Sequence, residues 1–201
     1  DAVVGNPPYI RIQELRENAP ELTEYLLAES RYQTTEGRFD IYAPFVEQGI
    51  RLAKRGNLSY ILPNKFFTRK HGEPLRKFLT TVQSPRKIFD FGQNQVFSNA
   101  TTYSCILSLG GSGESFQYTR VPHEVSMTEQ MLSLPSVSIG LDGLGSDSWV
   151  LTGPRQMQVL QRMESHGSKI EDVTDEIAEG ITSGDNDVLF IKIISEGSEF
   201  V

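Results

Sequence analysis

The chain has 201 residues, with 19 Lys and Arg against 26 Asp and Glu, so its formal net charge is −7. This length supplies one ordinary domain or one and a half, with enough chain to bury a core. A single cysteine, Cys105, excludes an internal disulfide framework and a thiolate metal cluster, which favours a reducing, cytoplasmic setting. We expect no membrane segment, because no apolar run approaches spanning length. We expect no metal site either, because the three histidines lack ligand spacing.

The charge is unevenly distributed along the chain. Residues 1–120 hold 15 basic and 12 acidic residues, a net charge of +3, whereas residues 121–201 hold 4 and 14, a net charge of −10. Between residues 64 and 87 only Glu73 opposes seven cations, which are Lys65, Arg69, Lys70, Arg76, Lys77, Arg86 and Lys87. Such a surface suits nucleic-acid phosphates, and we name Lys65, Arg69 and Lys70 as candidate backbone contacts. An ordinary solvated helix face is an equal alternative.

The sequence over residues 3–9, Val-Val-Gly-Asn-Pro-Pro-Tyr, predicts a short strand that ends abruptly in a turn. Neither proline can donate to a strand ladder, and both hold φ near about −65°. Asn6 Oδ1 and the Pro7 carbonyl oxygen could accept the two N–H bonds of an exocyclic amino group on a planar base, which would localise the nitrogen lone pair. Tyr9 offers an aromatic face for stacking. The residues therefore indicate methyl transfer to an amino group, and a plain strand-ending turn is the alternative.

A parallel strand–helix–strand unit is predicted next. Residues 10–36 are rich in charge with leucines at roughly helical spacing, so we expect a loop and one or two short helices over the site entrance. Asp40 is a good N-cap for a helix that ends near Lys54, with Gly56 as the residue after its end. A strand over residues 58–62 follows and completes the unit.

A second unit comprises a helix over residues 73–82 and a strand over 87–91. A strand over 101–109 returns after a short loop, which predicts an antiparallel hairpin, and residues 115–121 offer one more strand. Residues 122–148 are rich in Ser and Gly, so we expect a linker there with little regular structure. This places a first domain at 1–121 and a second at 149–201.

The second domain is predicted to begin with a helix over residues 153–164. Residues 180–186 then read Gly-Ile-Thr-Ser-Gly-Asp-Asn before a strand over 188–194. A Gly-rich phosphate cradle is one interpretation of this run, but it lacks the Lys and the preceding strand of a P-loop.

Asn-Pro-Pro-Tyr at residues 6–9 resembles the motif of S-adenosylmethionine-dependent amino-methyltransferases, and Asn with Tyr is similar to the N6-adenine DNA branch, as in type IIG restriction-modification enzymes. The helix predicted after Asp40 and the strand ending at Asn64 resemble the elements that follow this motif. Gln95-Val96-Phe97 resembles the family's late motif, whose Phe packs against the flipped base. Residues 180–186 resemble the start of a target-recognition domain.

The resemblance implies an α/β fold. It would be the C-terminal half of a Rossmann-like methyltransferase sheet, mixed and with a terminal antiparallel hairpin, followed by the start of a second α+β domain. It further implies S-adenosylmethionine as the cofactor, double-stranded DNA as the partner, and a flipped adenine held between Tyr9 and Phe97 with Asn6 and Pro7 accepting from its amine. For Phe97 the alternative is a loop aromatic that fills the core between two strands.

The family also has a Gly-rich methionine-binding loop and an acidic residue that holds the ribose, and neither is in this chain. Because the first residue is Asp and a strand follows at once, we expect both to precede Asp1 in a longer protein. The isolated chain is then expected to be inactive, with Asn6 at the edge of the cofactor pocket. Two alternatives stay open, an RNA or protein-glutamine methyltransferase and a non-catalytic DNA-specificity scaffold.

Overall fold

The computed structural model describes residues 2–28, 31–54, 56–82, 85–97, 102–110, 113–123, 129–142, 144–168 and 170–174. The chain divides into two compact units, Asp1–Gln156 and Met157–Val201. The helix predicted over 153–164 is confirmed as α5 (Pro154–His166), and α6 (Ile170–Val173) follows it. The run at 180–186 and the strand expected over 188–194 lie outside the described residues.

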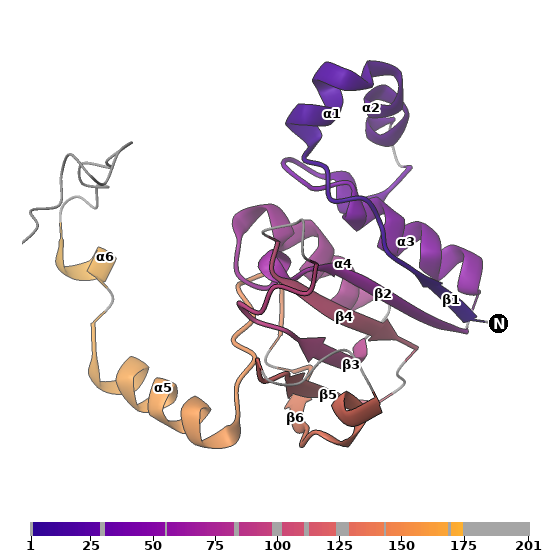
Figure 1. Ribbon diagram of the computed structural model, residues 1–201. Coiled ribbons are helices and arrows are strands. Elements are labelled where there is room, and N and C mark those ends of the chain that lie inside the picture. The colour runs from indigo at the N-terminus through magenta and orange to yellow at the C-terminus, as the bar shows by residue number, and fades with distance from the viewer. Residues whose placement is uncertain are drawn as a thin grey trace, which may run out of the picture. The chain divides into compact units, whose positions relative to one another are not determined.

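One mixed sheet forms the centre of the first unit (Figure 1). Its strand order is β1-β2-β4-β3-β5-β6. The strands are β1 (Ala2–Gly5), β2 (Asn57–Pro63), β3 (Pro85–Asp90), β4 (Ser104–Leu109), β5 (Ser115–Arg120) and β6 (Val137–Gly140). The pairing of β1 with β2 is parallel, and β3 and β4 form the predicted antiparallel hairpin. The α/β fold class is therefore confirmed, and so is the further strand expected near residues 115–121.

The strand directions bring the ends of four strands to one edge of the sheet. Strand β4 lies between β2 and β3 and is antiparallel to both, so β1, β2 and β3 run the same way. Strand β5 is parallel to β3. We call the edge where these four strands end the carboxyl edge. In open α/β sheets the loops at such an edge are the usual place for ligands.

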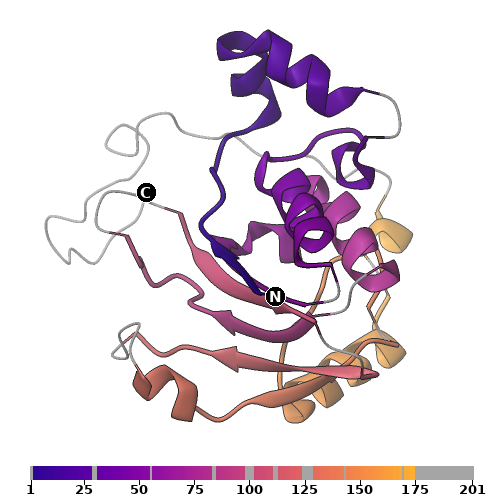
Figure 2. The same ribbon diagram turned by 90° about the vertical axis from the view of Figure 1, so that its right-hand side faces the viewer.

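Helices α3 (Tyr42–Ala53) and α4 (Glu73–Thr81) cover one face of the sheet (Figure 2). Both are amphipathic, and their buried side chains join the core residues of β2, β3 and β4. Gly49 is the point of closest approach, since a Cβ there would lie 2.3 Å from Leu58 and 2.6 Å from the Tyr60 hydroxyl. The absence of a side chain at Gly49 thus lets α3 pack directly on β2.

The ends of α3 differ from the sequence expectation. Ile41 is its N-cap residue, and Asp40 makes no capping bond; the Asp40 carboxylate instead lies 3.6 Å from His71 Nε2. At the other end, Lys54 has the positive φ of 49°, while the Gly56 amide donates to the Ala53 carbonyl at 2.7 Å. Asp40 thus stands one residue before the N-cap position that the sequence assigned to it.

A small helical layer precedes α3. It consists of α1 (Ile12–Asn18), α2 (Pro20–Leu27) and the 3₁₀ turn η1 (Gln33–Thr35), which confirms the expected short helices. These elements have their own apolar cluster, made of Ile12, Leu15, Leu26, Phe39 and Ile41. The buried Glu47 carboxylate of α3 holds η1 in place, because it accepts hydrogen bonds from the Thr34 amide and from the Thr34 hydroxyl, both at 3.1 Å.

The expectation of a linker over residues 122–148 is wrong. This segment contains the 3₁₀ turn η4 (Glu129–Ser133) and strand β6, which pairs with β5. The Ser and Gly residues of β6 occupy its exposed positions, whereas Ile139 is buried. Trp149 is only 2 % exposed and packs against three aromatic rings of the core, Phe66, Phe67 and Phe116. The first unit therefore continues to Gln156.

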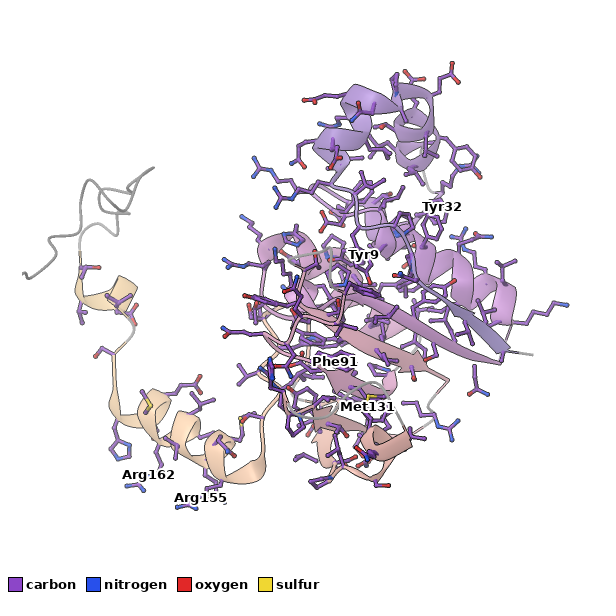
Figure 3. The ribbon with its side chains drawn as sticks, in the orientation of Figure 1. Tyr9, Tyr32, Phe91, Met131, Arg155 and Arg162 are labelled. Carbon is purple, nitrogen blue, oxygen red and sulfur yellow. The ribbon has the colours of Figure 1, made fainter. Side chains whose placement is uncertain are left out.

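A third apolar cluster lies on the other face of the sheet, where Phe91 and Met131 pack together with Phe89 and Val121 (Figure 3). Cys105 on β4 is buried on the opposite face, and burial raises the pKa of its thiol well above the usual value. Of the helices in the described ranges, none is long and apolar enough to cross a membrane.

Trp149→Ala should lower the free energy of unfolding by about 3–5 kcal/mol, because it leaves a cavity among aromatic rings. Val150→Ala, a half-exposed neighbour, should change it by less than about 0.5 kcal/mol. Urea denaturation followed by far-ultraviolet circular dichroism measures both. Equal effects would show that residue 149 lies outside the folded unit.

Candidate functional site

The Asn-Pro-Pro-Tyr turn follows β1 at the carboxyl edge and is held at both ends. Before it, β1 pairs with β2 as far as Gly5 and Tyr60. After it, the Ile10 carbonyl accepts from the Ile41 amide at 2.9 Å, which fastens the chain to the start of α3. The two prolines between these anchors restrict the backbone further. The turn is therefore rigid without needing bonds of its own.

Two hydrogen-bond acceptors of this turn, on Asn6 and Pro7, accept no hydrogen bond from the described residues. Asn6 is exposed, and its side chain has no partner among the described residues. Within the same part of the chain, no N–H group donates to the Pro7 carbonyl. The two acceptors are adjacent in the chain, but their exposure differs, because Asn6 is exposed whereas Pro7 is buried.

Tyr9 is half-buried at the same edge, and its ring is fixed by its hydroxyl (Figure 3). That hydroxyl donates to the Ile61 carbonyl of β2 at 3.2 Å. Burial raises the pKa of the Tyr9 phenol to about 12, although a hydrogen bond with Ser104 acts in the other direction. The phenol therefore stays protonated at neutral pH and keeps its donor. A ring held at its far end cannot swing away from the turn.

Asp90, which the sequence analysis missed, joins the loops of the carboxyl edge. Its side chain is buried, and Oδ1 accepts from Asn64 Nδ2 and from the Gly92 amide, both at 2.9 Å. Its Oδ2 accepts from the Tyr118 hydroxyl at 2.8 Å and from the Arg120 guanidinium at 2.5 Å. The carboxylate thus links the end of β2, the loop after β3 and strand β5. An acidic residue within the apolar run at 88–91 was the available signal.

Gly92 is required by the same arrangement. Its φ is 59°, and a Cβ at this position would lie 1.7 Å from the Arg120 guanidinium. Only a glycine lets the backbone turn beneath that side chain. The loop that leads to Phe97 therefore leaves β3 in one defined direction.

Phe97 ends the described part of this loop. Asn94 holds the loop by donating from its side chain to the Val121 carbonyl at 2.9 Å, and Val96 packs on the Phe91 cluster. Phe97 itself is partly buried and, among the described residues, belongs to none of the three apolar clusters. This placement argues against the alternative in which Phe97 fills the core.

The basic run does not form one surface. Lys65, Arg69 and Lys70 are exposed on the turns η2 (Asn64–Phe67) and η3 (Lys70–Gly72), which follow β2 at the carboxyl edge. Arg76, however, is only 3 % exposed and serves the fold. Arg86 lies at the start of β3, at the opposite edge, where it donates to Asn57.

Comparisons with known proteins show what the chain is similar to. A family model described as the Eco57I restriction-modification methylase matches residues 1–97. The type II restriction enzyme and methyltransferase RM.Eco57I of Escherichia coli is 31 % identical over 206 residues, which cover 100 % of this chain and 20 % of that protein. The type II methyltransferase M.PaeR7I of Pseudomonas aeruginosa is 29 % identical over 201 residues, covering 92 % and 34 %. The chain thus spans a fifth to a third of these relatives.

Solved structures share the fold. A protein of Vibrio vulnificus YJ016, described as the modification subunit of a type I restriction enzyme, aligns with a TM-score of 0.54 at 14 % identity, covering 80 % of this chain and 40 % of that one. The DrdV–DNA complex aligns with a TM-score of 0.51 at 16 % identity, covering 69 % and 17 %.

Asp90→Asn should lower the free energy of unfolding by about 1–3 kcal/mol, because it turns an amide N–H₂ toward one pair of the donors that the carboxylate now accepts from. Glu114→Gln, an exposed carboxylate change in the same unit, should cost less than about 0.5 kcal/mol. Denaturation midpoints of the two variants give the comparison. A midpoint for Asp90→Asn equal to that of Glu114→Gln would contradict the role of Asp90.

Proposed function

Because residues 1–97 belong to the family of Eco57I restriction-modification methylases, we propose that the chain forms the target-base half of a DNA methyltransferase. The proposed reaction transfers a methyl group from S-adenosylmethionine to the N6 amino group of adenine. One observation carries the proposal: Asn6 and the Pro7 carbonyl have no hydrogen-bond partner among the described residues, and they lie on a turn beside the tethered ring of Tyr9.

The chemistry of these residues suits an adenine amine. Its nitrogen is a poor nucleophile, because the lone pair is delocalised into the ring. When Asn6 Oδ1 and the Pro7 oxygen accept its two N–H bonds, the lone pair localises toward the methyl donor. The rigid turn presets both acceptors, so little reorganisation accompanies the reaction.

Adenine must leave the duplex to reach such a turn. We assign Tyr9 and Phe97 to the two sides of the extruded base, since both lie on loops of the carboxyl edge that are anchored independently. Stacking on an aromatic ring is worth about 1–3 kcal/mol per base. This would offset much of the cost of unstacking.

S-adenosylmethionine supplies an electrophilic methyl group on a sulfonium when bound. Asn6 is the residue that we assign to the edge of its pocket, because it is exposed at the end of β1 and offers both an amide donor and an acceptor. A side chain between the two ligands would orient the base toward the methyl group.

Double-stranded DNA is the proposed partner. The exposed Lys65, Arg69 and Lys70 lie at the carboxyl edge, and we assign them to the DNA backbone. The second unit, which follows Gln156, is proposed as the start of the target-recognition domain. The DNA-bound state of the structural relative DrdV supports this choice of partner.

The main rival is an amino-methyltransferase that acts on RNA or on a protein glutamine. The relatives named as type II methyltransferases favour DNA. A methyl-acceptor assay of the full-length protein, with radiolabelled S-adenosylmethionine and DNA, RNA or release-factor protein, separates the two. Label in DNA adenine supports the proposal, and label confined to RNA or protein overturns it. The absence of transfer to any acceptor would favour a non-catalytic specificity scaffold.

Asn6→Ala in the full-length protein should lower the single-turnover rate by about 10²-fold or more, because it removes one preorganised acceptor. Asn18→Ala, on the exposed end of α1, is the matched control and should keep the wild-type rate. Rapid-quench measurement with saturating DNA reports the chemical step. An unchanged rate for Asn6→Ala would refute its role.

Phe97→Ala should cost about 1–3 kcal/mol of flipped-base stabilisation, seen as lost fluorescence when 2-aminopurine replaces the target adenine. Phe45→Ala, an equally large change at a partly exposed position of α3, should retain the signal. If Phe97→Ala unfolds the protein while flipping survives in the folded remainder, Phe97 is a core residue.

A further inference from the structure

A basic hollow lies beside the turns that follow β2. It has a volume of about 850 Å³ and is lined by the segment before α3 on one side and by η3 and the start of α4 on the other. Its four permanent cations are Arg38, Arg69, Lys70 and Lys77. All four are exposed, so their charged groups can meet a ligand from solution.

The charge balance of this hollow is positive. Two carboxylates, Glu36 and Glu73, line it against the four cations, which leaves a net charge of +2. The pKa of His71, another residue that lines the hollow, also indicates a positive local charge. Burial lowers the pKa of His71, and the nearby charges of Lys65, Arg11 and Arg69 lower it further although Asp40 opposes them.

Arg76 fixes one wall of the hollow from inside the protein. It donates to the carbonyls of Phe66 at 2.6 Å, Arg69 at 2.9 Å and Ser146 at 2.8 Å. Gly72 allows the turn to close, because a Cβ there would lie 2.3 Å from the Phe66 carbonyl oxygen. The backbone that presents Arg69 and Lys70 is therefore preorganised, which lowers the entropic cost of binding an anion.

The hollow lies near the segment that follows the Asn-Pro-Pro-Tyr turn. A second, smaller hollow shares Arg38 and His71 with it and is also lined by Arg11. Arg11 stands two residues after Tyr9, and its backbone pairs with that of Asp40 in an isolated antiparallel β-bridge. Glu14, Glu17 and Asp40 also line the second hollow, so the positive charge balance belongs to the first hollow.

We propose that the hollow lined by Arg38, Arg69, Lys70 and Lys77 binds a phosphodiester of the DNA backbone, which adds Arg38 and Lys77 to the backbone contacts already assigned to Arg69 and Lys70. This inference rests on the proposed function and adds a position for the duplex. Cations from two separate segments can flank one phosphate group, and each neutralised phosphate releases counterions. A free phosphate is the alternative occupant of the same chemistry.

The test compares two charge-matched double variants of the full-length protein. Arg38→Gln with Lys77→Gln removes two cations of the hollow. Lys54→Gln with Arg86→Gln removes two exposed cations from near the start of β2, at the opposite edge of the sheet. Affinity for a target duplex is measured from about 50 to 200 mM salt for both and for the wild type.

The hollow double variant should reduce the slope of log K against log salt by about 0.9 for each lost phosphate contact, whereas the control double keeps the wild-type slope. Equal slopes for all three proteins, or an equal reduction in both doubles, would overturn the hollow but not the proposed function. A wild-type protein that neither binds nor methylates DNA would overturn both.

A competition experiment with inorganic phosphate distinguishes a DNA phosphodiester from a free phosphate as the occupant of the hollow. If DNA occupies the hollow, inorganic phosphate should compete with the duplex and weaken its binding to the wild type. It should not weaken duplex binding to the Arg38→Gln, Lys77→Gln double variant. Phosphate that binds the wild type in calorimetry and is not displaced by saturating duplex would identify a free-anion site and overturn the inference.

Discussion

The Asp90 carboxylate is the interaction on which the carboxyl edge depends. Removing a charge of this kind from water costs several kcal/mol, and only close partners on both oxygens can offset that cost. Asp90 has them, because its four hydrogen bonds come from Asn64, Gly92, Tyr118 and Arg120. The donors belong to three different segments, so none of these segments can shift without leaving the carboxylate underpaired. The carboxylate therefore holds these three segments of the edge together.

The two sides of the proposed base pocket are held in different ways. Tyr9 is fixed through its own hydroxyl, which is bound to β2, whereas Phe97 is positioned through its neighbours Asn94 and Val96. The first side is thus held through its own side chain, and the second is held through the backbone of its loop. The two sides of such a pocket are anchored to different segments of the chain, so each can keep its position when an extruded base enters.

The sequence predicted most of the first unit because its signals are local. Apolar periodicity marked α3, α4 and the strands, and the Pro-Pro turn marked the end of β1. The failures concern partners that are distant in the chain. Arg76 reads as one more surface cation until the carbonyl of Ser146 is beside it, and Trp149 reads as part of a second domain until it meets Phe116. Composition misled at β6 because a strand with one buried face needs only alternate apolar residues.

The burial of Cys105 leaves the chain without a reactive thiol in its folded state. The thiolate is the reactive species, and the raised pKa and complete burial of Cys105 withhold it from modifying reagents. The chain also contains a single tryptophan, Trp149, which lies in the core of the first unit. A cysteine introduced at the exposed Ser165 of α5 would therefore be the site that a thiol-reactive dye labels. Resonance energy transfer from Trp149 to that dye would then report the distance between the two units in solution, with no other change to the chain.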